Sequence, residues 1–175
     1  MSELDAEWAR RIAEAEQRAR ASGRGDVADY LALRALNDMA RETGIEWLLA
    51  AFHAHAGEVN RAGASISLTN DDAHRFRVGN STMVGSRLTL RAGVRSLSIE
   101  AGWPRTPHDG IVRGGGLAAA RVTHFGDRRA GDELLLVQSA GGAPHWLILD
   151  EIAAGGSRTA LEEERVRRHV AKLLP

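Results

Sequence analysis

The hydrophobic pattern of the chain changes its period once, near Gly63, and this change limits the fold more than any other feature. Between residues 45 and 59, apolar side chains recur at i, i+3, i+4, i+7, i+11 and i+14, the spacing that lines one face of an α-helix. Beyond Gly63, apolar and polar residues alternate, as in HRFRV (74–78) and RLTLR (87–91), which is the period of a half-buried β-strand. The sequence therefore predicts a helical first third followed by a β-rich remainder.

Glycines are expected to divide the helical part into three helices. The first ends at Gly23 and Gly25, the second near Gly44 and the third at Gly63. Glycine is unfavourable inside a helix and common just past its end, so these positions are natural stops. The three helices together occupy residues 1–63.

Strand-like segments follow within residues 64–152, and their connections are short and rich in glycine. Because short links join antiparallel neighbours, they predict an antiparallel meander of about six to seven strands. A capping box formed by Thr159 and Glu162 predicts a C-terminal helix over 157–174 that packs on the sheet. The segments are 74–78, 87–91, 94–100, 117–125, 133–138 and 145–150. The expected fold is a single α+β domain over residues 1–175.

Composition and the N-terminal residues exclude several classes of protein. The chain has no cysteine, so disulfides and thiolate metal ligands are excluded. Its first residues, MSELDAEWARR, are acidic and polar where a secretory signal has a basic segment and an apolar run. No apolar run approaches the roughly 18 residues of a membrane span. We therefore expect a cytoplasmic protein. Lys172 is the only lysine among 23 basic residues, a bias that a GC-rich bacterial genome would produce.

Local motifs for a cofactor, a metal or a nucleophile are absent. GRGDVA (23–28) matches a dinucleotide pattern but follows a helix instead of a strand, and GGGLAA (114–119) precedes a segment unsuited to the required helix. His53 and His55 lie in a predicted helix, where their side chains point about 200° apart and cannot share a metal. Neither H-E-x-x-H nor G-x-S-x-G occurs. We expect no cofactor and no bound metal.

Basic residues are concentrated in the middle of the chain. Residues 73–131 hold ten arginines against three acidic residues, whereas residues 1–72 hold eight arginines against thirteen acidic residues. Four of the arginines fall on the polar side of predicted strands, and these are Arg75, Arg77, Arg87 and Arg91. They are expected to share one sheet face suited to phosphate, carboxylate or an acidic protein surface. A solvated outer face, or one docked on the acidic helices, has the same pattern.

The longest predicted connection, WPRTPHDGIVRGGG (103–116), is the densest chemical stretch of the chain. Irregular loops beyond about 12 residues are uncommon in compact domains and are often functional. The candidate ligand contacts in this loop are Trp103, Arg105, His108, Asp109 and Arg113. In the alternative interpretation, Trp103 anchors a connecting loop to the core and Asp109 begins a turn.

These patterns leave three hypotheses for the function. The first is a small binding protein without catalytic activity, which holds an anionic small molecule or an acidic protein partner through the arginine face and the 103–116 loop. The second is a hydrolase or transferase for a phosphorylated or acidic metabolite, with His108 and Asp109 as an acid–base pair and Arg105 and Arg113 holding the anion. The third is a subunit that assembles into a homo-oligomer. Zero net charge, one lysine and 5% aromatic residues argue against a nucleic-acid partner.

Overall fold

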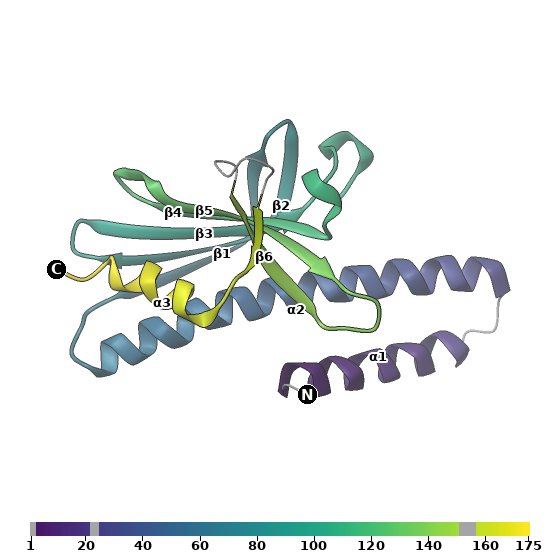
Figure 1. Ribbon diagram of the computed structural model, residues 1–175. Helices are drawn as coiled ribbons and strands as arrows, with labels where there is room; N and C mark the ends of the chain where they lie inside the picture. The colour runs from purple at the N-terminus through teal and green to yellow at the C-terminus, as the bar shows by residue number, and fades with distance from the viewer. Residues whose placement is uncertain (1–2, 22–24, 151–156) are drawn as a thin grey trace.

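The chain begins with a helical hairpin. The computed structural model describes residues 3–21, 25–150 and 157–175. In it, α1 (Glu3–Ala21) runs antiparallel beside the longer α2 (Gly25–Arg61), as Figure 1 shows. The predicted break at Gly23 lies outside the described residues. The helix end predicted near Gly44 is wrong, because α2 continues through this residue without interruption.

Gly44 lies where α2 packs against the sheet. A Cβ atom on Gly44 would stand 2.6 Å from Cδ1 of Leu136. The Gly44 carbonyl also accepts a hydrogen bond of 2.8 Å from the indole nitrogen of Trp146. Tertiary packing of this kind outweighs the helix propensity of one residue, which is worth about 1 kcal/mol. Gly44 therefore marks a close contact between helix and sheet and not a helix end.

Seven antiparallel strands form one meander in which each strand pairs with the next along the chain. They are β1 (Ser67–Val78), β2 (Ser81–Ala92), β3 (Arg95–Trp103), β4 (Ala118–His124), β5 (Asp127–Gln138), β6 (Pro144–Asp150) and β7 (Ser157–Ala160). The C-terminal helix α3 (Glu163–Ala171) follows the sheet. The predicted α+β layout of helices, antiparallel meander and C-terminal helix is confirmed.

The C-terminal helix begins six residues later than the predicted 157–174, because residues 157–160 form β7. Thr159 pairs with Ile148 in the sheet, so it does not cap the helix, and the predicted capping box is wrong. Glu162 occupies the N-cap position without a side-chain hydrogen bond to the helix. Thr159 instead pairs through its backbone with β6, and a β-branched residue is well suited to such a strand.

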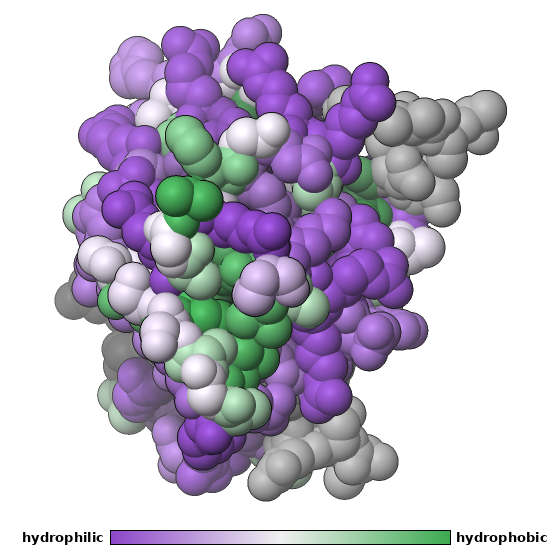
Figure 2. Space-filling view, turned by 90° about the vertical axis from the view of Figure 1, so that its left-hand side faces the viewer, coloured by the Kyte–Doolittle hydropathy of each residue, from purple (hydrophilic) through white to green (hydrophobic). Residues whose placement is uncertain are grey.

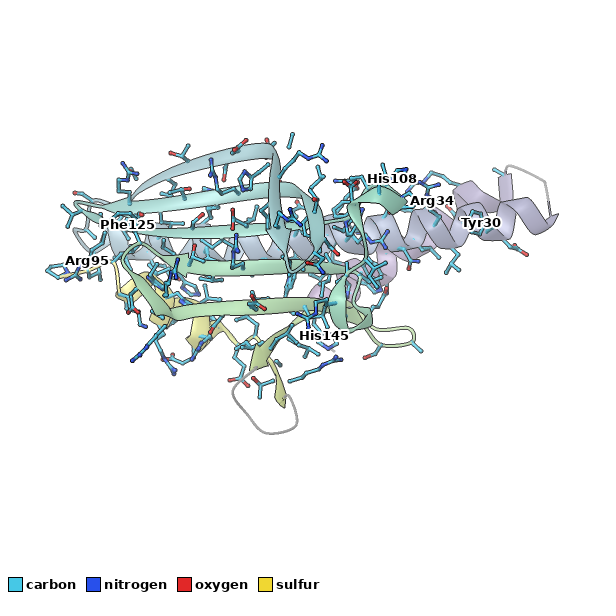
Figure 3. All side chains as sticks on the ribbon, turned by 90° about the horizontal axis from the view of Figure 1, so that it is seen from above. Tyr30, Arg34, Arg95, His108, Phe125 and His145 are labelled. Atoms are coloured by element: carbon cyan, nitrogen blue, oxygen red, sulfur yellow. The ribbon has the colours of Figure 1, made fainter. Side chains whose placement is uncertain are left out.

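Both α2 and α3 lie on one face of the sheet, called here the inner face, and the core lies between them (Figure 1). Core side chains include Leu48 and Phe52 of α2, Leu88, Leu90, Leu97, Ile99, Leu134 and Leu136 of the sheet, and Val166 and Val170 of α3. Among the described residues no helix covers the opposite, outer face, which is viewed in Figure 3. The first part of α2, marked by Tyr30 in Figure 3, extends past the sheet.

A β-bulge divides β1 into two parts. Asp71 pairs with Arg87, but the next regular pair is His74 with Gly85, so β1 holds one more residue than β2 across this interval. Ala73, within the bulge, has φ of 74°, in the left-handed region that non-glycine residues seldom occupy. Because side chains alternate between the two faces, the extra residue exchanges the faces of every later residue in β1.

Hydrophobic side chains reach the surface at one end of the molecule, where Figure 2 shows a patch bordered by polar residues. The tips of the β2–β3 and β4–β5 hairpins lie at this end, as the positions of Arg95 and Phe125 in Figure 3 show. Val94 is 92% exposed and Phe125 is 82% exposed. Among the described residues, no helix combines the length and the hydropathy that crossing a membrane requires.

Candidate functional site

The four predicted arginines do not share one sheet face. Alternate residues of β2 fill the core, which leaves Arg87 and Arg91 on the outer face. Arg75 and Arg77 lie beyond the β-bulge, and their partners in β2 belong to the inner-face set. The prediction of a single arginine face is therefore wrong. It assumed an uninterrupted period of two, and the bulge breaks that period.

The 103–116 segment is a packed connection that folds back against the β1–β2 hairpin. It contains 3-10 turns at Pro107–Asp109 and Arg113–Gly115. The Ser81 hydroxyl donates to the Ile111 carbonyl at 2.8 Å and accepts from the Ile111 amide at 3.1 Å. These two bonds tie the middle of the segment to the start of β2.

Asp109 holds this connection in place. Its carboxylate accepts hydrogen bonds from the Thr106 amide and hydroxyl, at 3.0 and 2.9 Å, and from Arg75 at 3.3 Å. The Thr106 hydroxyl, more than the nearby Arg75 charge, holds the pKa of Asp109 below its usual range. His108 is exposed, and no hydrogen bond joins it to Asp109 in the described part of the chain. The carboxylate is thus engaged with the turn instead of orienting His108.

A charged cluster on the outer face was not found from the sequence. Glu100 of β3 accepts hydrogen bonds from Arg121 at 2.6 Å and contacts Nε2 of His74 at 2.7 Å. Burial would raise the pKa of Glu100, but the contacts with Arg121 and His74 outweigh burial and lower it. The His74 ring stacks on Phe76 with centroids 5.9 Å apart. The sequence signal for this cluster is Glu100, which is the one acidic residue within the strand-like segment 94–100.

A separate network of buried, hydrogen-bonded polar side chains lies on the inner face, where α3 crosses β4 and β5. Asp132 forms two hydrogen bonds with Arg165, at 2.6 and 2.7 Å, and contacts Nε2 of His169 at 2.9 Å. His169 in turn contacts His124 at 2.9 Å. Burial would raise the pKa of Asp132, but Arg165 and His169 hold it far below its usual range. Burial, together with the His169 and Lys172 charges, lowers the pKa of His124 to about 4.

A concave site, a cleft of about 740 Å³, lies between α2 and the β1–β2 hairpin, next to the bulge. Its apolar walls are formed by Ile45 and Leu49 of α2, Val84 of β2 and Trp103 at the end of β3. Charged side chains at the cleft are Glu42, Glu46, Asp72 and Arg105. Two residues of the predicted list, Trp103 and Arg105, therefore meet here.

Trp103 and Arg105 form a fixed pair at one end of the cleft. The Arg105 guanidinium lies 3.5 Å from the centre of the Trp103 ring, in cation–π contact. Trp103 is 5% exposed and packs in the core at the start of the connection. Arg113 lies elsewhere, with its Cδ near Gly79 in the β1–β2 turn. The five predicted loop residues therefore do not converge on one site.

Among the described residues, no group of histidine and acidic side chains is arranged to hold a metal ion. No protein-family model, no curated protein and no solved structure matches the chain. The structure therefore assigns the protein to the α+β class, with an open seven-stranded sheet and a cleft beneath one edge of that sheet.

Proposed function

We propose that this protein is a binding protein whose ligand site is the cleft between α2 and the β1–β2 hairpin. The observation that carries the proposal is the cleft itself, with a volume of about 740 Å³, apolar walls and a few charged groups. Small-molecule sites generally have volumes of about 300–1,000 Å³ and combine apolar walls with a small number of polar groups. The two smaller pockets, at β1–β2 and at β5–α3, have volumes of about 300 Å³ each.

The charges at the cleft favour a ligand with an apolar body and a cationic or hydrogen-bond-donating end. Three carboxylates, those of Glu42, Glu46 and Asp72, contribute to the lining. Arg105 is the one guanidinium among the lining residues, and it is stacked on Trp103. Opposite charges attract and like charges repel across such a site, so an ammonium group is preferred to a carboxylate. This proposal replaces the anionic ligand that the sequence predicted with one of the opposite sign.

The backbone beside the cleft supports a role for this region. Ala73 lines the cleft and holds φ of 74° within the bulge. A non-glycine residue in the left-handed region costs roughly 1–2 kcal/mol, and such residues cluster at ligand sites. The bulge is also what places Asp72 and Ala73 together on the cleft wall.

Two probes of one shape and opposite charge test the proposal. We expect 1-naphthylmethylammonium to bind more tightly than 1-naphthylacetate, as measured by isothermal titration calorimetry. Replacing an exposed carboxylate, as in Glu42→Gln or Asp72→Asn, removes about 0.2–1 kcal/mol of attraction. This should weaken the ammonium probe by up to about fivefold and leave the acetate probe no weaker.

A matched pair of tryptophan substitutions tests the location. Ala50 lines the cleft and Ala54, one turn later on α2, does not, and both are exposed. Ala50→Trp should fill the cleft and weaken the ammonium probe by more than about tenfold, or 1.4 kcal/mol. Ala54→Trp should leave binding unchanged. Equal binding of the two probes, or binding that survives Ala50→Trp, would contradict the proposal.

A further inference from the structure

We propose that a second site, independent of the cleft, binds a phosphoryl group in a basic pocket between β5 and α3. The pocket has a volume of about 300 Å³. This is enough for a small anion and less than half the volume of the cleft. Its lining consists of Arg129 and Ala130 from β5, Arg165, Arg168 and His169 from α3, and Lys172 directly after α3. The two sites have no residue in common.

Helix geometry and strand geometry together bring these cations to one place. Arg165, Arg168 and Lys172 are spaced at i, i+3 and i+7, so they lie along one side of α3 and the residue that follows it. Arg129 approaches the same pocket from β5. The site is thus assembled from two segments more than thirty residues apart in the sequence, which explains why no local motif revealed it.

Few negative charges balance this pocket. Two described carboxylates lie nearby. Both oxygens of Asp132 are engaged by Arg165 and His169, and the Asp127 carboxylate accepts a hydrogen bond from the backbone amide of Arg129 at 3.1 Å. In the part of the chain that the structure describes, no carboxylate lies within 4.0 Å of the charged groups of Arg129, Arg168 or Lys172. Three positive side chains therefore line the pocket without an ion pair to any described carboxylate.

The helix dipole accounts for only part of this arrangement. Cations are favoured near the C-terminus of a helix, which would place Arg168 and Lys172 there without any ligand. It does not account for Arg129, which belongs to a strand. Just past the end of α3, the carbonyls of Lys172 and Leu174 accept hydrogen bonds from Arg95 of β3.

The number and type of donors fit a phosphoryl dianion. Such a group offers three strongly accepting oxygens, and guanidinium groups bind phosphate through paired hydrogen bonds. The base of the pocket is fixed in advance, since Arg165 is held by Asp132 and His169 is buried with 4% of its surface exposed. A preformed pocket loses less entropy on binding than one that must be ordered by its ligand.

Titration with inorganic phosphate and with phenyl phosphate at pH 8 tests this site, with ionic strength held constant by chloride. We expect both anions to bind saturably by calorimetry and to raise the midpoint of thermal unfolding. Arg129→Gln and Arg168→Gln should each weaken binding by about tenfold, as expected for the loss of one charge-assisted contact. Both side chains are exposed, so neither variant is expected to unfold the protein.

Matched controls come from the neighbouring residues. Arg128→Gln and Arg167→Gln remove the same charge one residue away, and neither side chain lines the pocket. Binding in these controls should stay within about twofold of the parent, the scale of a screened surface charge. If phenyl phosphate binds as tightly as inorganic phosphate, the site is assigned to a small phosphorylated molecule. If phenyl phosphate binds much more weakly, the site is assigned to free phosphate. Absence of saturable binding, or equal weakening in all four variants, overturns the proposal.

Discussion

Replacing Gly44 with alanine tests the contact between α2 and the sheet, because two opposing effects act at this position. Alanine is favoured over glycine inside a helix by about 1 kcal/mol. The new Cβ would however stand 2.6 and 2.7 Å from the two methyl carbons of Leu136. Carbon atoms pack at about 3.5–4.0 Å, so Leu136 or the helix must move by about 1 Å.

This movement sets the magnitude of the effect. Leu136 is fully buried, and overpacking of a core costs about 1–3 kcal/mol. A shift of α2 away from the sheet also stretches the hydrogen bond from Trp146 to the Gly44 carbonyl, which contributes about 1 kcal/mol. The gain in helix propensity offsets about as much as the weakened hydrogen bond costs, so Gly44→Ala should lower the free energy of unfolding by about 1–3 kcal/mol. Urea denaturation followed by circular dichroism measures this loss.

Two comparisons separate the clash from other effects. Gly57 lies in the same helix, and the nearest atom to a Cβ there is a terminal nitrogen of Arg61 at 3.5 Å. Gly57→Ala should therefore stabilise the protein by up to about 1 kcal/mol. In a Leu136→Ala background, Gly44→Ala should change sign and become stabilising, because the obstructing methyl groups are gone. A stabilising Gly44→Ala in the unmodified protein would refute this reasoning.

Two further predictions concern the buried network of polar side chains under α3. Because burial lowers the pKa of His124 from 6.5 to about 4, the unfolded chain binds more protons than the folded chain between these values. Stability should therefore fall as the pH drops from about 6.5 to about 4, and a series of urea titrations should show a shallower fall for His124→Gln. Asp132→Asn should lose about 2 kcal/mol at pH 7, since it leaves Arg165 and His169 without their carboxylate. Urea midpoints within error of the parent would show that this carboxylate does not stabilise the docking of α3.

Most of the architecture follows from the change of period at Gly63, because helices and strands bury their apolar residues at different spacings. The errors have local causes. The sequence pattern predicts a helix end at Gly44, but in the structure this residue allows α2 to approach Leu136 closely. The pattern likewise predicts a helix cap at Thr159, but the backbone of this residue pairs with Ile148. Local propensities are small beside such tertiary contacts, so the sequence alone could not rank them.

The candidate sites were less accessible to sequence reasoning than the fold. Trp103 and Arg105 were identified because they stand in one unusual segment, and both line the cleft. Their counterparts Glu42 and Asp72 come from a helix and from a bulge, at positions that no local pattern connects. The bulge also moves Arg75 from the expected outer face to the inner face, and only the pairing of β1 with β2 reveals this change. Sites assembled by tertiary contacts leave little trace in local spacing.

The irregularity in β1 has a consequence for how copies of this chain meet one another. β1 is an edge strand of the sheet. An uninterrupted edge strand presents a row of unpaired backbone N–H and C=O groups, with which a strand of another molecule can pair and start aggregation. The kink at Ala73 interrupts that row near its middle, and Asp71, Asp72, Arg75 and Arg77 place charge along it. At the other border, β7 offers only four residues. Both borders of the sheet are therefore poor templates for aggregation, even though no α-helix among the described residues covers the outer face.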